Sequence, residues 1–506
     1  MLRTIGRAEV LLHNTTEDLW VIIDGYVYDL SKFKDLHPGG APPLKFVAGK
    51  DASDAFYGLH RSSILKEKRF ERLRVGRVAG YTPPPTPPPT PYSEPLFIRK
   101  HSPYYNDSHH KLRRDVRAFI DEHIAPTAAD DDEFGEDPSM ELNVAMGNAG
   151  ILAAIVGPEA AQLGFKPIGM ESFENFDYFH DMVIAEEFKR LGTYGLSDGL
   201  VGGLSIGLPV ILTFGSRSLK ERVGIPCLNG TKRIALAISE PYAGSDVARI
   251  QTQARLSPDG KHYIVSGVKK WITGGRFADF FTTLTVTEKG YVLMVIERDT
   301  GAVTTKPIKT SYSSAAGTAY VEFNDALVPV ENVVGEVGKG FNYTMYNFNH
   351  ERWGMCVGGN RMSRMMLEEA FKWATQRKIF KKRLIDQPVI RYKLAQMAAD
   401  IECVHSMIED MTYQMCNMSV AEINQSLAGP IALLKYKQTR VATLVADQVC
   451  QIFGGRALTR TGMGKFVEKF QRSYKMQAIL GGSEEIMADL AIRQAMKGAG
   501  SHPAML

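Results

Sequence analysis

The pattern of hydrophobic and polar positions changes three times along the 506 residues of the chain. Residues 4–80 alternate short apolar runs with short helical pieces. From Lys111 to about Lys220, apolar positions recur at the spacing of amphipathic helices. Between Arg233 and Val334 short β-type runs take over, and from Phe341 onward long amphipathic helices return. The order α, β, α after the first module predicts a small sheet domain between two helical domains.

Individual elements follow from this pattern. In the first module the apolar runs Trp20–Ile23 and Tyr26–Tyr28 flank Asp24-Gly25, which is typical of a tight β-hairpin turn. Turn residues such as Pro258-Asp259-Gly260 separate the predicted strands of the sheet domain. These strands cover residues 234–236, 262–265, 280–286, 291–296 and 320–323. The predicted long helices cover residues 362–377, 389–418 and 430–453.

A proline-rich segment divides the chain. Tyr81–Pro95 reads YTPPPTPPPTPYSEP, and proline at this density favours polyproline II, a semi-rigid spacer. Such segments also serve as ligands of signalling domains, but we interpret this one as a linker. The predicted organisation is a small α+β domain at 4–80, the linker at 81–95, an α-helical domain at 96–230, a β domain at 231–338 and a helical bundle at 339–500.

The composition narrows the classes of function. A net charge of +4 is small for this length and gives no reason to expect nucleic-acid binding. The five cysteines lie far apart without a CxxC pair, which favours buried free thiols in an intracellular chain. The longest apolar stretch, Gly199–Leu212, is glycine-rich, contains Pro209 and is too short to predict a membrane span.

The chain ends give weak indications of location. Strand-like sequence begins by Glu9, which leaves no room for a cleavable signal. The C-terminal Ala504-Met505-Leu506 is at most a degenerate peroxisomal signal. We expect a soluble intracellular protein, either cytoplasmic or peroxisomal.

Two histidines in the first module suggest an iron site. They lie in the motifs Leu36-His37-Pro38-Gly39-Gly40 and Phe56-Tyr57-Gly58-Leu59-His60. A histidine before proline is by itself usually part of a turn. A haem held by two imidazoles, however, needs histidines on facing walls of a cleft, and the glycines allow a tight backbone turn beside the ring.

These motifs, with the hairpin before them, resemble the cytochrome b5 family over most of the first module. The resemblance implies that His37 and His60 are the two axial ligands of a haem b. With both axial positions filled by protein, such a haem passes single electrons and leaves no open site for oxygen. Pro42 and Pro43 depart from the helix-forming residues usual after the glycines.

Two segments of the predicted β domain are the most informative about the function of the chain after the linker. Ala237–Val247 reads AISEPYAGSDV and Val268–Gly275 reads VKKWITGG. Each alone is typical of a strand that ends in a polar turn. Together with Gly338–Phe341, Arg377–Phe380, Gln387-Pro388 and Gln451–Gly455, they resemble the acyl-CoA dehydrogenase family. The resemblance covers the chain after the linker and implies an α-helical domain, a β-sheet domain and a four-helix-bundle domain that bind FAD and an acyl-CoA.

The resemblance also implies roles for particular residues. Those implied to bind FAD are Ile238, Ser239, Gly244, Ser245, Trp271, Thr273, Ser483 and Glu485, of which Glu485 departs from the amide often found there. Those implied to reach the FAD of a neighbouring subunit are Arg377, Phe380, Gln451, Gly454 and Gly455, which predicts a homodimer or homotetramer. Those implied to contact the substrate are Ser245, Phe348, Arg352 and Gly481.

The catalytic base is displaced from its more common position. Dehydrogenation of a thioester removes the α-hydrogen as a proton, so a carboxylate must face the flavin. Many members of the family place it at the position of Gly481, which has no side chain to accept a proton. Glu351 falls on the position that other members use, and we predict that it is the base. The alternative for Glu351 is a surface ion pair with Arg352. Glu484 and Glu485 are nearby carboxylates, which we interpret as stabilising the dipole at the start of the final helix.

The sequence therefore predicts an FAD-dependent acyl-CoA dehydrogenase that passes electrons to a haem in the same chain. The electron acceptor beyond the haem and the acyl chain length are not predicted. One alternative is an oxidase or desaturase, in which oxygen reoxidises the flavin. A second is a different substrate, such as a nitroalkane or a tethered acyl chain. Another is a non-catalytic binder of flavin or acyl-CoA, which would have no need of Glu351.

Overall fold

The computed structural model describes residues 2–501 except 62, 63, 66, 84–87, 97, 99, 100 and 136. The chain divides into two compact units. Unit 1 comprises Met1–Ser93, Met366–Gln396 and Gln448–Lys469, and unit 2 comprises Glu94–Met365, Met397–Asp447 and Phe470–Leu506. The C-terminal Ala504-Met505-Leu506, weighed above as a targeting signal, lies outside the described residues.

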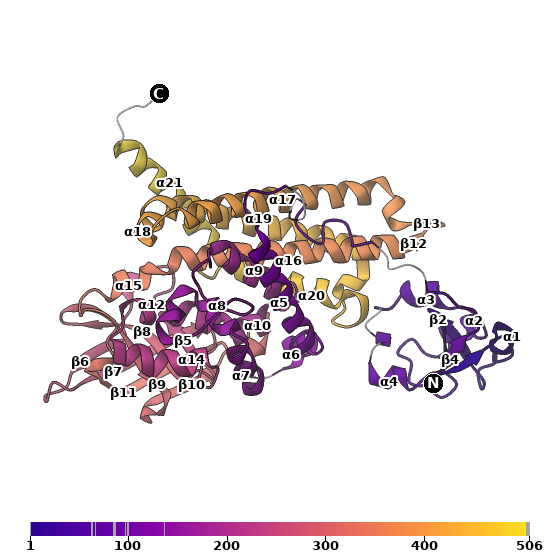
Figure 1. Ribbon diagram of the computed structural model, residues 1–506, viewed down its shortest axis with the longest axis horizontal. Coiled ribbons are helices and arrows are strands. Elements are labelled where there is room, and N and C mark those ends of the chain that lie inside the picture. The colour runs from indigo at the N-terminus through magenta and orange to yellow at the C-terminus, as the bar shows by residue number, and fades with distance from the viewer. Residues whose placement is uncertain are drawn as a thin grey trace. The chain divides into compact units, whose positions relative to one another are not determined.

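The N-terminal part of unit 1 is a small sheet with short helices (Figure 1). Asp24 and Gly25 both have positive φ, 50° and 71°, and the predicted hairpin between the second and third strands is confirmed. The sheet order is β1 (Arg3–Ile5), β4 (Arg74–Val78), β3 (Tyr26–Asp29) and β2 (Trp20–Ile23). The helices are α1 (Arg7–Val10), α2 (Ala41–Val47), α3 (Ser53–Tyr57) and α4 (Lys68–Glu71).

Pro42 and Pro43 do not prevent a helix after the glycines. α2 begins at Ala41 and carries proline in its first turn. Proline is tolerated there because the first amides of a helix have no intrahelical acceptor. Leu44, one residue further, is buried in the core of this module together with Val21. The unusual sequence therefore leaves the local fold intact.

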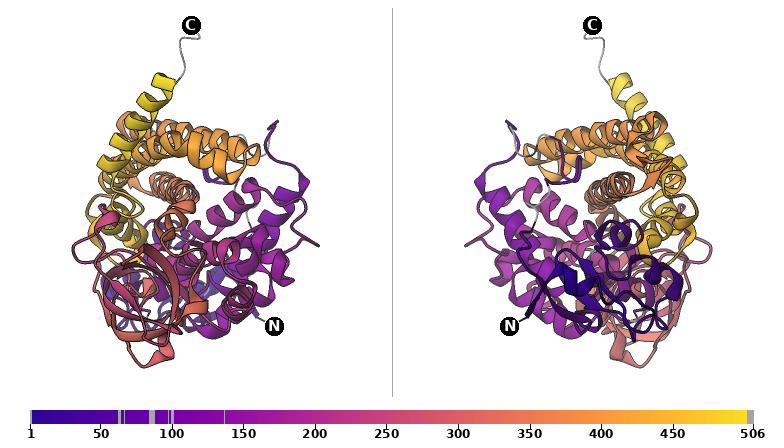
Figure 2. Two further views of the ribbon diagram at one scale, coloured as in Figure 1. Left: turned by 90° about the vertical axis from the view of Figure 1, so that its left-hand side faces the viewer. Right: turned by 90° about the vertical axis from the view of Figure 1, so that its right-hand side faces the viewer.

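The β region of unit 2 forms a seven-stranded sheet, whose strands face the viewer in the left panel of Figure 2. The strand order is β10-β11-β7-β6-β8-β5, and β9 pairs with β8. The bounds are β5 (Ile234–Ala237), β6 (Gln253–Leu256), β7 (His262–Ile272), β8 (Phe280–Thr287), β9 (Gly290–Glu297), β10 (Val303–Pro307) and β11 (Ala319–Pro329). All five predicted strands are present. The sequence did not predict β6 and β10, because few of their side chains are buried and their pattern is weak.

The two faces of this sheet belong to two different cores. Successive side chains of a strand point to opposite faces. Accordingly Phe280 and Leu284 of β8 join the core of the helices before the sheet, whereas Phe281 joins a core with Val321 and Phe323. The helices before the sheet are α5 (Asp107–His123), α6 (Ala128–Phe134), α7 (Met140–Asn148), α8 (Ile151–Val156), α9 (Tyr178–Lys189), α10 (Tyr194–Ser197), α11 (Gly203–Gly207), α12 (Pro209–Phe214), α13 (Arg217–Leu219) and α14 (Ile225–Leu228).

The glycine-rich apolar stretch is longer than the sequence suggested. Tyr194–Phe214 runs helically for 21 residues, and by length and composition alone it could cross a membrane. However, 72% of its apolar window is buried inside the fold. A Cβ atom at Gly203 would lie 2.2 Å from the carbonyl oxygen of Ile234, so glycine lets this helix approach β5 closely. Pro209 opens α12 and does not end the helical run.

Long helices complete the fold, and Figures 1 and 2 show them lying side by side. Trp353 donates from Nε1 to Oγ1 of Thr412 at 3.0 Å and thereby joins two of them inside unit 2. The helices are α15 (Gly340–Tyr346), α16 (Phe348–Gln376), α17 (Pro388–Cys416), α18 (Val420–Glu422), α19 (Ala428–Phe453), α20 (Lys465–Ser473) and α21 (Glu484–Ser501). The three predicted helices are present, although α16 begins fourteen residues earlier than predicted.

The five cysteines are free, as expected, but they are not all buried. Cys227 and Cys356 are buried, whereas Cys403 and Cys416 are exposed. The exposed pair lies on α17, whose outer face is open to solvent, and a cysteine there is indistinguishable in sequence from one facing the core.

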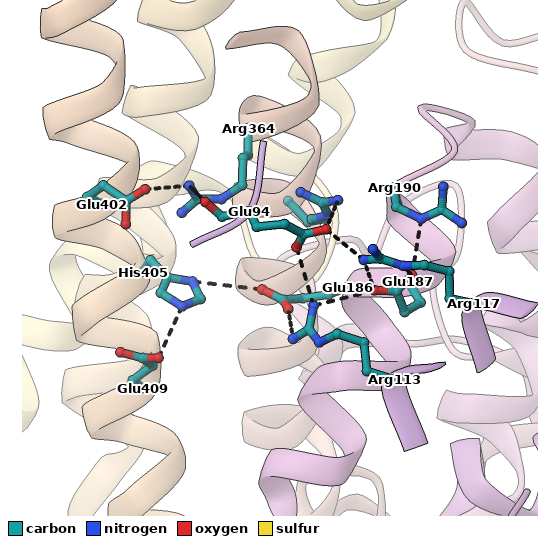
Figure 3. A network of polar contacts seen from close by, with 11 residues as sticks. Glu94, Arg113, Arg117, Glu186, Glu187, Arg190, Arg364, Glu402, His405 and Glu409 are labelled. Carbon is teal, nitrogen blue, oxygen red and sulfur yellow. Dashed lines mark hydrogen bonds and ion pairs between the residues drawn. The ribbon is translucent and has the colours of Figure 1, made fainter. Parts of the chain in front are cut away.

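The end of the linker is fixed by a buried network of charges in unit 2 (Figure 3). Glu94 accepts a hydrogen bond from Nη2 of Arg117 at 2.7 Å and lies 3.6 Å from Nη1 of Arg113. Arg364 donates to its backbone carbonyl at 3.2 Å. Burial alone would raise the pKa of Glu94, but Arg361, Arg113 and Arg117 together lower it below its usual value.

The same arginines are shared with two glutamates of α9. Arg113 contacts Glu186 at 2.6 Å, and Arg117 contacts Glu187 at 2.6 Å. The side chains of Glu186 and Glu187 are almost completely buried, so each must keep a cationic partner. Arg113 and Arg117 are therefore each shared between Glu94 and a buried glutamate of α9.

We predict that Glu94→Ala lowers the free energy of unfolding of unit 2 by about 1–3 kcal/mol at neutral pH, because charged hydrogen bonds are lost. Since the folded pKa of Glu94 is lowered, its contribution is present above the pKa of the unfolded carboxyl and is lost as the pH falls. Calorimetric melting of the wild type and the variant at several pH values measures both effects. Glu171→Ala is the control, because Glu171 is fully exposed in its pair with Lys166. An unchanged melting temperature for Glu94→Ala at neutral pH would contradict the prediction.

Candidate active site and haem site

The two histidines of the first module face one another. The ring centroids of His37 and His60 are 5.9 Å apart. Nδ1 of His37 lies 2.9 Å from the carbonyl oxygen of Gly40, and Nδ1 of His60 lies 3.2 Å from that of Phe56. A carbonyl only accepts, so each Nδ1 carries the proton and each Nε2 keeps a free lone pair. This is the tautomer that a metal ligand needs.

The surroundings support the same ligand form. Phe56 stacks on His60 at 4.8 Å with an interplanar angle of 8°. Burial lowers the pKa of His60, which favours the neutral imidazole. A Cβ atom at Gly39 would lie 3.0 Å from the ring of His37, so the glycine leaves room for the ring beside the backbone. The donor set and its orientation therefore fit a bis-histidine haem.

A second group of ligand-type side chains has a different role. One ligand atom each of His109, Asp177 and His180 lies within 4.8 Å of the others. Nδ1 of His109 accepts from the amide of Asn106, and Nδ1 of His180 accepts from the amide of Asp177. Both are capping boxes at the first turns of α5 and α9. The ring nitrogens are thus used in helix capping, and the cluster is explained without a metal.

The two segments implied to bind the flavin lie against each other. Ile238 and Ser239 follow β5 directly, and Trp271 lies near the end of β7. The amide of Lys270 donates to the carbonyl of Ser239 at 2.8 Å, which joins the two segments. Trp271 has a φ of 67° and is 53% exposed, so its ring stands out from the sheet.

A buried ion pair lies beneath these segments. Nζ of Lys269 contacts Oε1 of Glu240 at 2.8 Å and donates to the carbonyls of Ile238 and Leu284. Burial lowers the pKa of Lys269 to about 8, although Glu240 opposes this. The carboxylate of Glu240 also accepts from the amide and hydroxyl of Thr252. The pair fixes the backbone next to Ser239, where the flavin is expected.

The remaining predicted cofactor residues are mostly accessible. Gly244, Ser245 and Glu485 are exposed, while Thr273 and Ser483 are half-buried, all in unit 2. The residues implied to reach a neighbouring FAD all lie in unit 1. Of these, Phe380 is 89% exposed with a φ of 46°, Gln451, Gly454 and Gly455 are exposed, and Arg377 is half-buried.

Both candidate positions for the base meet in unit 2. Glu351 and Arg352 lie in the first turn of α16, whose Phe348 ring lies 5.6 Å from the guanidinium of Arg352. Nε of Arg352 donates to the carbonyl oxygen of Gly481 at 3.1 Å, and its Nη1 donates to Asn349 at 3.3 Å. Arg352 is therefore engaged away from Glu351, and the surface ion pair considered above is not formed.

The environment of Glu351 suits a base. Burial raises the pKa of Glu351, while Arg352, Lys435 and His350 oppose the shift. Within the described part of the chain, no hydrogen bond or ion pair engages its carboxylate. One turn later, Sδ of Met355 lies 2.6 Å from where a Cβ of Gly481 would be. Met355 thus fills the space in which a side chain at position 481 would start.

Lys435 of α19 supports the turn that contains Gly481. Its Nζ donates to the carbonyls of Leu480 at 2.6 Å and Gly482 at 2.5 Å. Burial lowers the pKa of Lys435 to about 8. Lys435 is not among the residues predicted from the sequence, but the sequence carries a signal for it. Lys435 continues the buried stripe of Ile431 and Leu434, where a lysine is unusual.

Comparisons with known proteins show the families to which the domains belong. Models of the acyl-CoA dehydrogenase N-terminal, middle and C-terminal domains match residues 106–231, 235–326 and 338–496. A model of the cytochrome b5-like heme/steroid binding domain matches residues 6–79. The facing histidines favour haem over steroid within that description.

Relatives and solved structures are similar over most of their length. Acyl-CoA dehydrogenase apdG of Emericella nidulans is 36% identical over 80% of this chain and 95% of its own. Acyl-CoA dehydrogenase AFT10-1 of Alternaria alternata is 33% identical over 80% and 96%. The crystal structure of a Bacillus anthracis acyl-CoA dehydrogenase complexed with FAD has a TM-score of 0.71 and 28% identity, over 80% of this chain and 71% of that one.

The fold and the site define a flavin-dependent oxidoreductase that acts on CH–CH bonds and carries a haem domain. The chain belongs to the acyl-CoA dehydrogenase family, with a cytochrome b5-like domain ahead of the three domains of that family. Its cofactors are FAD and haem. Both expected cofactors and the predicted fusion of two families are confirmed.

We predict that Lys435→Met slows flavin reduction by about 10–100-fold, the range associated with a misplaced catalytic group. The substitution removes two hydrogen bonds from the turn at Gly481 and leaves both carbonyls unsatisfied. Anaerobic stopped-flow measurement of flavin bleaching tests this. Lys437→Met is the matched control, since Lys437 is half-exposed on the same helix. Equal rates for both variants would show that Lys435 has no such role.

Proposed function

We propose that the chain catalyses the α,β-dehydrogenation of an acyl-CoA thioester, with Glu351 as base and the haem as the outlet for electrons. The single observation that carries the proposal is the partly buried Glu351 carboxylate. It has no hydrogen-bond or ion-pair partner among the described residues and is next in sequence to Arg352, which binds the Gly481 turn. A structural glutamate at this position would be expected to pair with Arg352.

The chemistry assigns a role to each group. The α C–H bond breaks with its proton passing to Glu351, and the β C–H bond breaks with its electron pair leaving as hydride, so that a C=C bond forms. When bound, FAD accepts that hydride and haem accepts electrons singly. The raised pKa of Glu351 keeps the carboxylate basic enough to take the proton near neutral pH.

The residues around the base are suited to orienting a thioester. Gly481 offers its backbone N–H, and a hydrogen bond to the thioester carbonyl would acidify the α-proton. Arg352 and Lys435 hold the carbonyls of the same turn, so the amide direction is fixed from two sides. Phe348 contributes an apolar surface to the same turn of α16.

We further propose that the protein acts as a homodimer or homotetramer. The residues implied to reach a neighbouring FAD are exposed or half-buried in this chain, as an interface position would be in an isolated subunit. Oxygen as the oxidant, or a substrate other than an acyl-CoA, are the competing candidates, and peroxide release in air distinguishes the first of them.

We predict that Glu351→Gln reduces the rate of flavin bleaching by acyl-CoA by roughly 10²–10⁴-fold, the usual contribution of a general base. FAD and haem should remain bound, because the amide keeps the shape of the side chain. In the wild type the rate should rise with pH and level off above a pKa higher than that of an ordinary carboxyl, since only the ionised carboxylate accepts a proton. Anaerobic stopped-flow with acyl-CoAs of graded length measures these rates. Bleaching retained in Glu351→Gln would redirect the search to Glu484 and Glu485.

We predict that His60→Ala abolishes the Soret spectrum of the haem while acyl-CoA still bleaches the flavin at the wild-type rate. The iron loses one of two ligands, whereas Glu351 and the flavin segments belong to unit 2. Recording the flavin and Soret wavelengths in one experiment separates the two cofactors. His13→Ala is the control, because His13 stacks on Trp20 and pairs with Asp18 away from the two ligands. Normal haem reduction in His60→Ala would refute the ligand assignment.

A further inference from the structure

Arg61, the residue directly after the haem ligand His60, is tied to the helical part of unit 1. Its Nη2 lies 2.6 Å from Oε2 of Glu369 on α16. Its Nε donates to the carbonyl of Gly462 at 3.1 Å, and Nη2 donates to that of Met463 at 2.5 Å. The guanidinium also lies 4.7 Å from the centroid of the Phe466 ring. One side chain thus joins the first module to two separate segments of the bundle.

These contacts are largely removed from water. The side chains of Arg61 and Glu369 are 14% and 8% exposed. A buried guanidinium is costly unless its donors find acceptors. Here a carboxylate, two carbonyls and an aromatic face are arranged around it, and the planar fork of arginine suits several acceptors at once. A second contact, Asp54 with Lys378 at 3.1 Å, is 94% and 64% exposed and contributes little.

We propose that Arg61 is the docking residue of the haem module, and that its pocket of Glu369, Gly462, Met463 and Phe466 holds this module against the bundle for electron transfer. Only the purpose of the docking, which is electron transfer from the flavin to the haem, rests on the proposed function. The contact itself stands on the geometry above. Because Arg61 is next to His60 in the chain, the face of the module that docks is one that carries a haem ligand.

Arg61→Glu tests the proposal in the full-length protein loaded with FAD and haem. The substitution places a carboxylate opposite Glu369 and two carbonyls, so the docked population should collapse. We expect haem reduction by the flavin to slow by about tenfold or more, as the competent fraction falls. We also expect a larger radius of gyration in small-angle X-ray scattering and faster amide exchange at residues 462–464. The Soret spectrum and flavin bleaching should stay at wild-type values.

Electrons are supplied in two ways so that failures can be told apart. Acyl-CoA tests the proposed function together with docking, whereas photoreduction of the flavin with a sacrificial amine donor tests docking alone. If acyl-CoA does not bleach the wild-type flavin, the proposed function fails, while photoreduction still reports on Arg61.

Two further variants keep the outcome decisive. Glu369→Arg changes the bundle side of the contact and avoids any direct effect on the haem pocket, and it should reproduce the slow haem reduction and the expanded scattering. Lys378→Ala, at the exposed pair, should behave as wild type. Haem reduction and scattering at wild-type values in both Arg61→Glu and Glu369→Arg would overturn the proposal.

Discussion

The hydrogen bond from Arg352 to the carbonyl of Gly481 is the constraint on which the catalytic arrangement depends. It joins the first turn of α16 to the turn before α21. These are the two places where a base could stand. Because the turn is held from the α16 side, a carboxylate on α16 and an amide at position 481 can address neighbouring atoms of one substrate. In the proposed function the base stands on α16, and the turn at Gly481 contributes its backbone.

The same bond explains why a glutamate next to an arginine is not neutralised by it. Arg352 donates hydrogen bonds to Gly481 and Asn349, and Lys435 donates hydrogen bonds to the carbonyls of Leu480 and Gly482. Both cations lie near Glu351 without contacting it. They limit the rise of its pKa but provide no hydrogen bond that would hold the carboxylate in its ionised form. A base near neutrality needs this intermediate state, since a closely paired carboxylate is too weak a base.

The sequence predicted the elements of secondary structure that depend on local residue patterns. The hairpin at Asp24-Gly25, the five strands and the three long helices follow from turn residues and periodicity, and they are confirmed. The assignments of Glu351, His37 and His60 stay predictions that the geometry accommodates. The linker end at Glu94, the pocket of Arg61 and the support from Lys435 depend on side chains brought together only by the tertiary fold. Hydrophobic periodicity does not predict these contacts. A charged residue with a buried partner and one that points to solvent look alike in a sequence.

In the proposed docking model, the length of the linker that ends at Glu94 sets the reach of the haem module. The prolines of this segment predict polyproline II, which extends ~3.1 Å per residue, so the covalent reach of Tyr81–Glu94 is about 40 Å. Within such a radius the module stays at an effective concentration in the millimolar range. A docking contact worth about 2 kcal/mol would then leave a few per cent of the molecules undocked at any moment. In the proposed function, one haem receives electrons from the flavin and later passes them to an external one-electron acceptor. The proposed docking contact at Arg61 and a short tether would meet both needs, because the contact would be closed most of the time and would open without losing the module.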